Sequence, residues 1–259
     1  MPSLFDASRD CGDAPARQGY WSASGVVLRR REDPHEGFRL LAFLKGTGLC
    51  WVNAPWAARG RRRFGAATEP LSWGEYRFYQ SPRRTTLQDA RLVDSYLSLH
   101  RDAESFREAL EACLWLSRLP LGIPGDEVLG LFWSHFRALT LPLVRPPLRV
   151  RFLYRWLRVQ GSAPELRRCS RCGEPLRGSL AWGRWGLECC AGRAEVPPDF
   201  LQDLCRAAML AREPFVEWVK TRYPGGLSPS DRARWKEAEG WLQGFFPEGR
   251  SLFQKGEGS

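Results

Sequence analysis

The chain has 259 residues, of which 43% are hydrophobic and 26% charged, a composition typical of an ordinary globular protein that can bury a core. No apolar run approaches the ~20 residues that a bilayer-spanning helix needs, which argues against an integral membrane protein. Residues 1–19 form an N-terminal extension without the charged-then-apolar layout of a signal peptide. We therefore expect a cytoplasmic protein whose cysteines stay reduced.

The formal net charge of +10 indicates a polyanionic partner. The excess is uneven along the chain. Residues 1–90 hold 14 lysines and arginines against 9 acids, residues 91–168 hold 12 against 8, and residues 169–259 hold 13 against 12. The basic surface is therefore expected to precede the last third of the chain. Nearly all of the excess is arginine, which a GC-rich genome would also explain.

Strand patterns come first in the chain. Apolar runs at 20–31 and 37–45 are followed by the glycine-containing turn 46–48, a third run at 49–53 and an aromatic alternation at 71–80. Several short strands within about 80 residues, with no helix of comparable strength, predict a small closed barrel. An OB-fold over residues 20–85 is the commonest such barrel that carries basic and aromatic faces.

A helical period replaces the strand pattern from Leu87 onward. Leu92, Val93, Tyr96 and Leu97 follow helical spacing, and so do the apolar residues of 106–116, 128–139 and 148–159. Prolines separate these segments. A helical domain is thus expected over 86–168, and helices at 199–211, 213–222 and 230–245 complete it within 196–259. The predicted class is α+β.

Four of the eight cysteines lie in the short segment 169–195. Cys169 and Cys172 have the C-x-x-C spacing that lets two thiolates face one ion, and Cys189 and Cys190 could close a tetrahedral zinc shell. A typical zinc ribbon repeats C-x-x-C, whereas here the second pair is adjacent. Both could bind, one could bind with Cys205 or a water, or the site could be lost. A redox pair and packed thiols are the alternatives to structural zinc.

Arginines are dense between residues 59 and 84, where seven face two glutamates. Guanidinium groups pair with phosphates and release condensed counterions, so this region predicts DNA binding without sequence preference. Interleaved aromatics could stack unpaired bases or could simply fill the barrel. The helix 148–159 offers a second arginine surface, or only a solvated face. The residues predicted to contact DNA are Arg29, Arg30, Trp56, Arg59, Arg61, Arg62, Arg63, Arg77, Arg83, Arg84, Arg151 and Arg155.

Enzyme chemistry has little support in the sequence. His35, His100 and His135 are scattered, and no glycine-rich phosphate loop is present. We expect a binding protein. A zinc-ribbon adaptor that binds RNA, or associates with the transcription or ribosome machinery, and a thiol enzyme using Cys169 and Cys172 remain alternatives.

The order of motifs resembles the RecO family of bacterial DNA-repair proteins over almost the whole chain. The opening strand 25–30, the basic loop 56–62, the segment 94–97 and the run from Leu157 to Gly173 match the family's motifs in order and spacing. The last resembles L-x-x-x-G-x-x-P-x-L-x-x-C-x-x-C-G. The segment 94–97 resembles the start of the family's first long helix.

This resemblance implies an N-terminal OB-fold and a helical domain with a zinc module inserted in it. It further implies a nucleoid-associated recombination mediator that binds single- and double-stranded DNA and anneals complementary strands. RecR and single-strand-binding protein are the implied partners, in a pathway that loads RecA. The N-terminal extension and the contracted Cys189–Cys190 pair depart from the family pattern.

Overall fold

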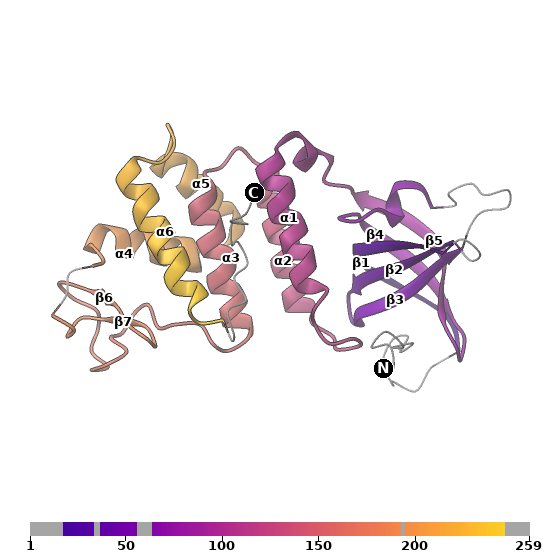
Figure 1. Ribbon diagram of the computed structural model, residues 1–259, viewed down its shortest axis with the longest axis horizontal. Coiled ribbons are helices and arrows are strands. Elements are labelled where there is room, and N and C mark those ends of the chain that lie inside the picture. The colour runs from indigo at the N-terminus through magenta and orange to yellow at the C-terminus, as the bar shows by residue number, and fades with distance from the viewer. Residues whose placement is uncertain (1–17, 34–36, 56–63, 193–194, 247–259) are drawn as a thin grey trace, which may run out of the picture. The chain divides into compact units, whose positions relative to one another are not determined.

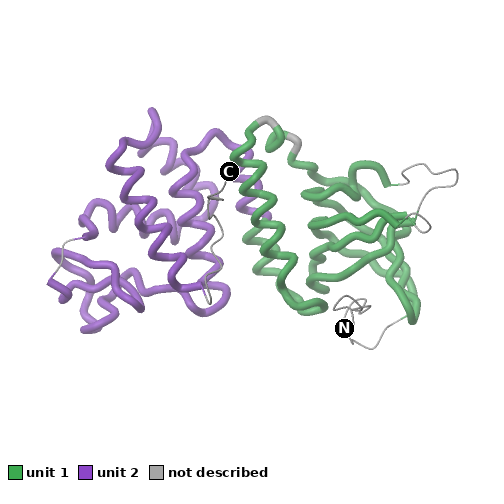
Figure 2. Tube along the Cα trace, viewed as in Figure 1, with its two compact units in different colours: residues 1–132 green, residues 133–259 purple. Residues whose placement is uncertain are grey.

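The computed structural model describes residues 18–33, 37–55, 64–192 and 195–246. The chain divides into two compact units, residues 1–132 and 133–259 (Figure 2). The first unit is built around a barrel and the second is mostly helical, so the α+β class is confirmed (Figure 1).

Unit 1 begins with a closed barrel of five strands in the order β1-β2-β3-β5-β4. Antiparallel ladders join all neighbours except β3 and β5, which pair in parallel through Asn53 and Thr86. Alternation along the strands places Leu40, Phe78 and Leu87 in the shared core. The strands are β1 (Gly19–Asp33), β2 (Gly37–Leu44), β3 (Gly48–Pro55), β4 (Trp73–Gln80) and β5 (Thr85–Asp94).

Strand β5 corrects the helix predicted from Leu87 onward. Thr85 and Leu87 are fully buried on the barrel side, and Leu92 and Val93 are exposed rather than part of a helical core face. The β4–β5 ladder shifts register twice, which breaks the strict alternation that a sequence pattern can detect. The barrel therefore extends to Asp94, beyond the boundary expected at residue 85.

The segment after β5 differs from the family-like helix start expected at 94–97. Tyr96 adopts a left-handed conformation with φ of 49°, and Asp94 accepts a hydrogen bond from its amide. The 3₁₀ helix η2 (Leu97–Arg101) follows, and α1 (Ala103–Leu116) begins only at Ala103. Asp102 caps α1 by accepting from the amides of Glu104 and Ser105.

The β2–β3 turn is held by the segment that leads into α2 (Asp126–Leu139). Gly122 donates to the Leu49 carbonyl at 2.8 Å, and Asp126 accepts from the Gly46 amide at 2.8 Å. Gly48 has φ of +82°, and a Cβ there would lie 2.0 Å from the Ile123 carbonyl oxygen. This glycine is therefore required both by its backbone conformation and by the close approach of residue 123.

Unit 2 places α3 (Arg145–Val159) at its centre, in contact with α4 (Pro198–Met209) and α6 (Pro229–Gln243). Phe152 and Leu157 of α3 are buried, together with Leu204 of α4 and Trp235 of α6. The fourth helix of this group is α5 (Arg212–Arg222). These helices agree with the predicted segments to within a few residues at each end.

The cysteine-rich segment forms a small module between α3 and α4. Its regular structure is the two-stranded sheet of β6 (Ala181–Trp182) and β7 (Leu187–Glu188). The module is fixed to the helices of its own unit, because Trp241 of α6 donates from Nε1 to the Gly183 carbonyl at 2.9 Å. In Figure 1 the module lies at the end of α4 and α6.

Candidate nucleic-acid interface and metal centre

Two tyrosines form an exposed pair on the outside of the barrel. Tyr20 of β1 lies opposite Tyr79 of β4 in the ladder, and their ring centroids are 5.1 Å apart. Their neighbours Trp21 and Phe78 point the other way and pack at the core, so alternation forces the tyrosines outward. Tyr20 is 64% exposed and Tyr79 is 38% exposed. The pair offers π-faces on which unpaired bases can stack.

Arginines lie beside this pair and in the turn that follows Tyr79. The Arg77 guanidinium carbon lies 5.0 Å from the Tyr20 ring centroid, in the range of a cation–π contact. Arg83 and Arg84 are exposed in the β4–β5 turn, where Ser81 accepts a hydrogen bond at its Oγ from the Arg84 amide at 3.1 Å. Guanidinium groups of this kind can bind phosphates. We call the set the tyrosine–arginine cluster: Tyr20, Arg77, Tyr79, Arg83 and Arg84.

A second group of arginine and aromatic side chains lies on β1, β2 and β3. Arg31 pairs in register with Arg39, and Arg39 with Asn53. The Arg39 guanidinium lies 5.1 Å from the Trp51 ring centroid, which repeats the cation–aromatic arrangement of the first cluster. Sequence reasoning did not select Arg31 or Arg39. The alternation of Arg39 with buried Phe38 and Leu40 was the available signal.

The predicted residues of the barrel have different surroundings. Arg29 is exposed and available to a ligand. Arg30 instead forms an ion pair with Glu69 and lies 4.6 Å from the Phe38 ring centroid, so it ties β1 to the segment after η1 (Gly65–Thr68). A further set of predicted residues lies outside the described part of the chain: Trp56, Arg59, Arg61, Arg62 and Arg63.

Arg151 and Arg155 have a structural role that the sequence did not indicate. Arg151 is 4% exposed and donates from Nη1 to the carbonyls of Ala207 (3.2 Å) and Leu210. Arg155 donates to the carbonyls of Ala208 (3.3 Å), Met209 (3.3 Å) and Leu210. Both guanidiniums thus bind the C-terminal end of α4, where carbonyls lack helical partners and the helix dipole is negative. The burial of Arg151 corrects its assignment as a DNA contact.

Burial also affects the charge of these two arginines. Desolvation lowers the pKa of Arg151 to about 9, and the positive charge of Arg155 acts in the same direction. Desolvation likewise lowers the pKa of Arg155. The hydrogen bonds to α4 must therefore offset a real cost of burying two like charges together.

The cysteine cluster has the geometry of a metal site. Cys169 Sγ lies 3.7 Å from Cys190 Sγ, and Cys172 Sγ lies 3.7 Å from Cys189 Sγ. The sulfurs of Cys169, Cys172 and Cys189 all lie within 4.8 Å of one another. Tetrahedral bonds of roughly 2.3 Å to one zinc ion would separate the sulfurs by about 3.8 Å, whereas a disulfide needs about 2.05 Å. The thiols of Cys169, Cys172 and Cys189 therefore fit zinc, and Cys190 places a fourth thiol beside Cys169.

Backbone amides support this cluster. Cys169 Sγ accepts from the amides of Cys172 (3.5 Å) and Cys189 (3.4 Å). Desolvation opposes ionisation, but these amides and that of Arg171 together lower the pKa of the Cys169 thiol to about 5. Desolvation and the sulfur contacts raise the pKa of Cys189 to about 11, as expected when neighbouring thiols compete to ionise. Cys205 takes no part, because its thiol contacts the Leu166 carbonyl at 3.7 Å.

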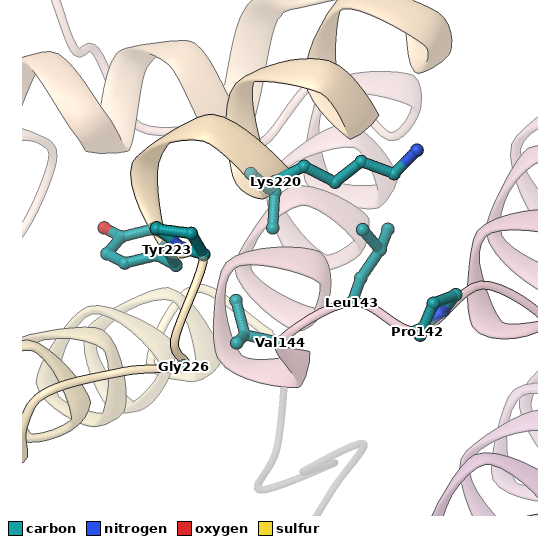
Figure 3. Close-up of a pocket in the computed structure, with 8 residues that line it drawn as sticks. Pro142, Leu143, Val144, Lys220, Tyr223 and Gly226 are labelled. Carbon is teal, nitrogen blue, oxygen red and sulfur yellow. The ribbon is translucent and has the colours of Figure 1, made fainter.

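A surface pocket of about 480 Å³ lies in unit 2, between the chain entering α3 and the end of α5. Figure 3 shows Leu143, Val144, Lys220 and Tyr223 lining it. Lys220 pairs with Glu217 at 3.4 Å, and the Tyr223 hydroxyl donates to Asp203 at 3.3 Å. The polar side chains that line the pocket are thus each engaged by a carboxylate.

The protein is therefore an α+β protein. It combines a closed barrel that carries exposed arginine–aromatic contacts with a helical unit that contains a four-cysteine module. Within the described residues, no helix has both the length and the apolar character needed to cross a membrane.

Comparison with known proteins finds similarity to one family. Residues 116–202 match the family described as recombination protein O, C terminal. The DNA repair protein RecO of Syntrophobacter fumaroxidans is 27% identical over 159 residues, which cover 61% of this chain and 63% of that protein. These matches support membership of the RecO family.

Two further relatives carry the same name. The RecO of Heliobacterium modesticaldum is 29% identical over 160 residues, or 60% of this chain and 57% of the relative. That of Rubrobacter xylanophilus is 25% identical over 187 residues, or 69% and 74%. The matches to the Syntrophobacter and Heliobacterium proteins thus span less than two thirds of the length of those relatives.

Proposed function

We propose that this protein acts in DNA repair and recombination by binding single- and double-stranded DNA and annealing complementary strands. The relatives named DNA repair protein RecO support the repair role. The observation that carries the DNA-binding part is the tyrosine–arginine cluster, where stacking rings and phosphate-binding groups lie together on an exposed barrel face. In this proposal the protein is a binding protein rather than an enzyme.

The barrel is the proposed DNA-binding domain, and we assign it to the OB-fold. The five-stranded order and the parallel β3–β5 closure support this assignment. Binding would be tolerant of sequence, because every base has a π-face and every nucleotide a phosphate. Arg29, Arg31, Arg39 and Trp51 would extend the surface for a longer strand.

The resemblance to the RecO family extends the proposal to partner proteins. Annealing would act on strands coated by single-strand-binding protein, and with RecR the protein would help load RecA. The zinc site would have a structural role: Cys169, Cys172, Cys189 and Cys190 would hold the ion, which would link residues 169–172 to residues 189–190.

The test is single-strand binding by variants of the tyrosine–arginine cluster. Tyr20→Ala combined with Tyr79→Ala should weaken the affinity for a single-stranded oligonucleotide of arbitrary sequence by about 5- to 150-fold. This is the equivalent of about 1–3 kcal/mol of stacking. Arg77→Ala should reduce the slope of log K against log salt by about 0.7. Arg91→Ala is the matched control, because Arg91 is an exposed barrel arginine already paired with Glu75.

Wild-type affinity and salt slope in all of these variants would refute the proposed interface, provided that the variants unfold at the wild-type temperature. Competition between deoxy- and ribo-oligonucleotides of the same sequence would separate DNA binding from the RNA-binding alternative. Stronger competition by RNA would favour the adaptor.

A further inference from the structure

The hairpin between β6 and β7 has a two-residue tip. Trp182 pairs with Leu187 in the ladder, and Gly183 donates from its amide to the Gly186 carbonyl at 3.0 Å. Arg184 and Trp185 therefore occupy the two loop positions. Gly183 is sterically required, since a Cβ there would lie 2.5 Å from the Gly186 oxygen, and Gly186 is tightly packed, since a Cβ there would lie 3.0 Å from the Glu165 oxygen.

The base of the hairpin is firmly held within its unit. The Trp182 ring packs on Trp241 of α6 with centroids 4.8 Å apart, and Trp241 Nε1 bonds to the Gly183 carbonyl. On the other side, Leu187 donates to the Glu165 carbonyl at 3.3 Å and accepts from the Ser170 amide at 2.9 Å. The tip is therefore displayed on a rigid support.

The tip itself faces solvent. Trp185 is 69% exposed, more than any other large hydrophobic side chain in the described residues. The Arg184 guanidinium carbon lies 5.0 Å from the Trp185 ring centroid. An exposed indole ring beside a guanidinium can stack on a base and bind the adjoining phosphate.

The surroundings of Trp185 favour a nucleotide over an apolar protein surface. Among described residues of the module 165–192, no other large hydrophobic side chain is exposed, whereas protein interfaces usually join several into a patch. A single ring with an adjacent guanidinium instead matches one base and its phosphate. The other exposed arginines of the module are Arg167, Arg168, Arg171 and Arg177.

Net charge does not carry this inference. Residues 165–190 contain five arginines against three glutamates, and four thiolates with one zinc ion would add a charge of −2 at the sulfur cluster. What matters is the placement of the ring and the guanidinium at an exposed tip.

We propose that the Arg184–Trp185 tip is a second contact site for unpaired DNA, in which the indole stacks on a base and the guanidinium binds the neighbouring phosphate. This rests on the proposed single-strand binding by the barrel. Each unit of the chain then has its own strand contact. Strand annealing requires two strands to be held at once, so the tip should matter more for annealing than for binding one short strand.

The experiment uses the full chain with single-stranded oligonucleotides that contain 5-iodouracil, followed by photo-crosslinking and peptide mass spectrometry. Crosslinks are expected at Trp185 as well as at the tyrosines of the barrel. Trp185→Ala should slow annealing of complementary strands at least 5-fold and weaken binding of a short oligonucleotide by less than 3-fold. Leu114→Ala, at another exposed apolar side chain, is the control and should match wild type.

The outcomes separate the two proposals. Crosslinks on the barrel alone, with wild-type annealing by Trp185→Ala, would overturn the tip site and leave barrel binding intact. Absence of crosslinks throughout, with no measurable affinity, would overturn both. Arg184→Lys is a second variant, which keeps the positive charge and should retain most of the annealing rate. If it slows annealing as much as Trp185→Ala does, the result would indicate a damaged hairpin instead of a strand contact.

Discussion

The Arg151 side chain allows a sharp test, because a structural role and a DNA contact predict opposite results. It crosses from α3 to the C-terminal end of α4 and lies 4.7 Å from the Phe215 ring centroid. In Arg151→Ala the Ala207 carbonyl would lose its guanidinium partner, whereas the Leu210 carbonyl would keep the hydrogen bond from Arg155. The perturbation therefore removes one essential partner and a packed aliphatic stem.

The expected cost follows from these contacts. A buried carbonyl left without its partner costs about 1–3 kcal/mol. Two buried methylene groups add about 1.6 kcal/mol, and the charge that no longer needs to be buried returns part of this. We expect a net loss of roughly 2–4 kcal/mol for Arg151→Ala and about 1 kcal/mol for Arg151→Met, which keeps the stem. At roughly 4 °C per kcal/mol, the alanine variant should unfold about 8–16 °C below wild type.

The assay is thermal unfolding followed by circular dichroism, with strand annealing measured well below the transition. Arg158→Ala is the control, because Arg158 lies on the same helix but is exposed. Both arginine variants should anneal at the wild-type rate at low temperature. If Arg151→Ala unfolds at the wild-type temperature but anneals strands slowly, the structural assignment is refuted and Arg151 is instead a DNA contact.

Two further predictions concern the metal centre and the barrel. Cys189→Ser and Cys190→Ser should each reduce bound zinc, measured by elemental analysis, and lower the unfolding temperature, whereas Cys205→Ser should change neither; retention of zinc by either of the first two would show that the adjacent pair does not act as described. Gly48→Ala should destabilise the barrel by several kcal/mol in urea unfolding, and Gly46→Ala by only about 1 kcal/mol, because both have positive φ but only residue 48 meets a carbonyl oxygen; equal losses would contradict the close packing of residue 123.

The regular part of the fold was predictable from periodicity. The first four strands and the helices of unit 2 were located because a single buried face repeats at period 2 or 3.6. Strand β5 was missed because Leu92 and Val93, which suggested a helix, are exposed, and because register shifts interrupt the alternation of β4 with β5. A local pattern cannot show which apolar residues are left outside the core.

The candidate site was predictable in kind but only partly in position. The C-x-x-C spacing indicated a metal site, but whether two adjacent cysteines can both reach it depends on how the chain folds back between residues 172 and 189. Likewise, the arginines of α3 looked like a solvated or DNA-binding face. Their partners are backbone carbonyls more than 50 residues away in the sequence. Because every residue has a backbone carbonyl, residue type cannot indicate which carbonyl will accept such a hydrogen bond.

The closure of the barrel has a consequence for how it moves. Between the described parts of β3 and β5, the barrel is closed by a single registered pair, Asn53 with Thr86. The antiparallel ladders, in contrast, run the length of their strands. Mechanical opening is easiest where the fewest ladder bonds must break together. The barrel should therefore open locally at the β3–β5 pairing before it opens elsewhere. Amide protons beside this pairing would exchange with solvent earlier than those at the centre of β1. Pairing of β5 with β3 would be the last step of folding.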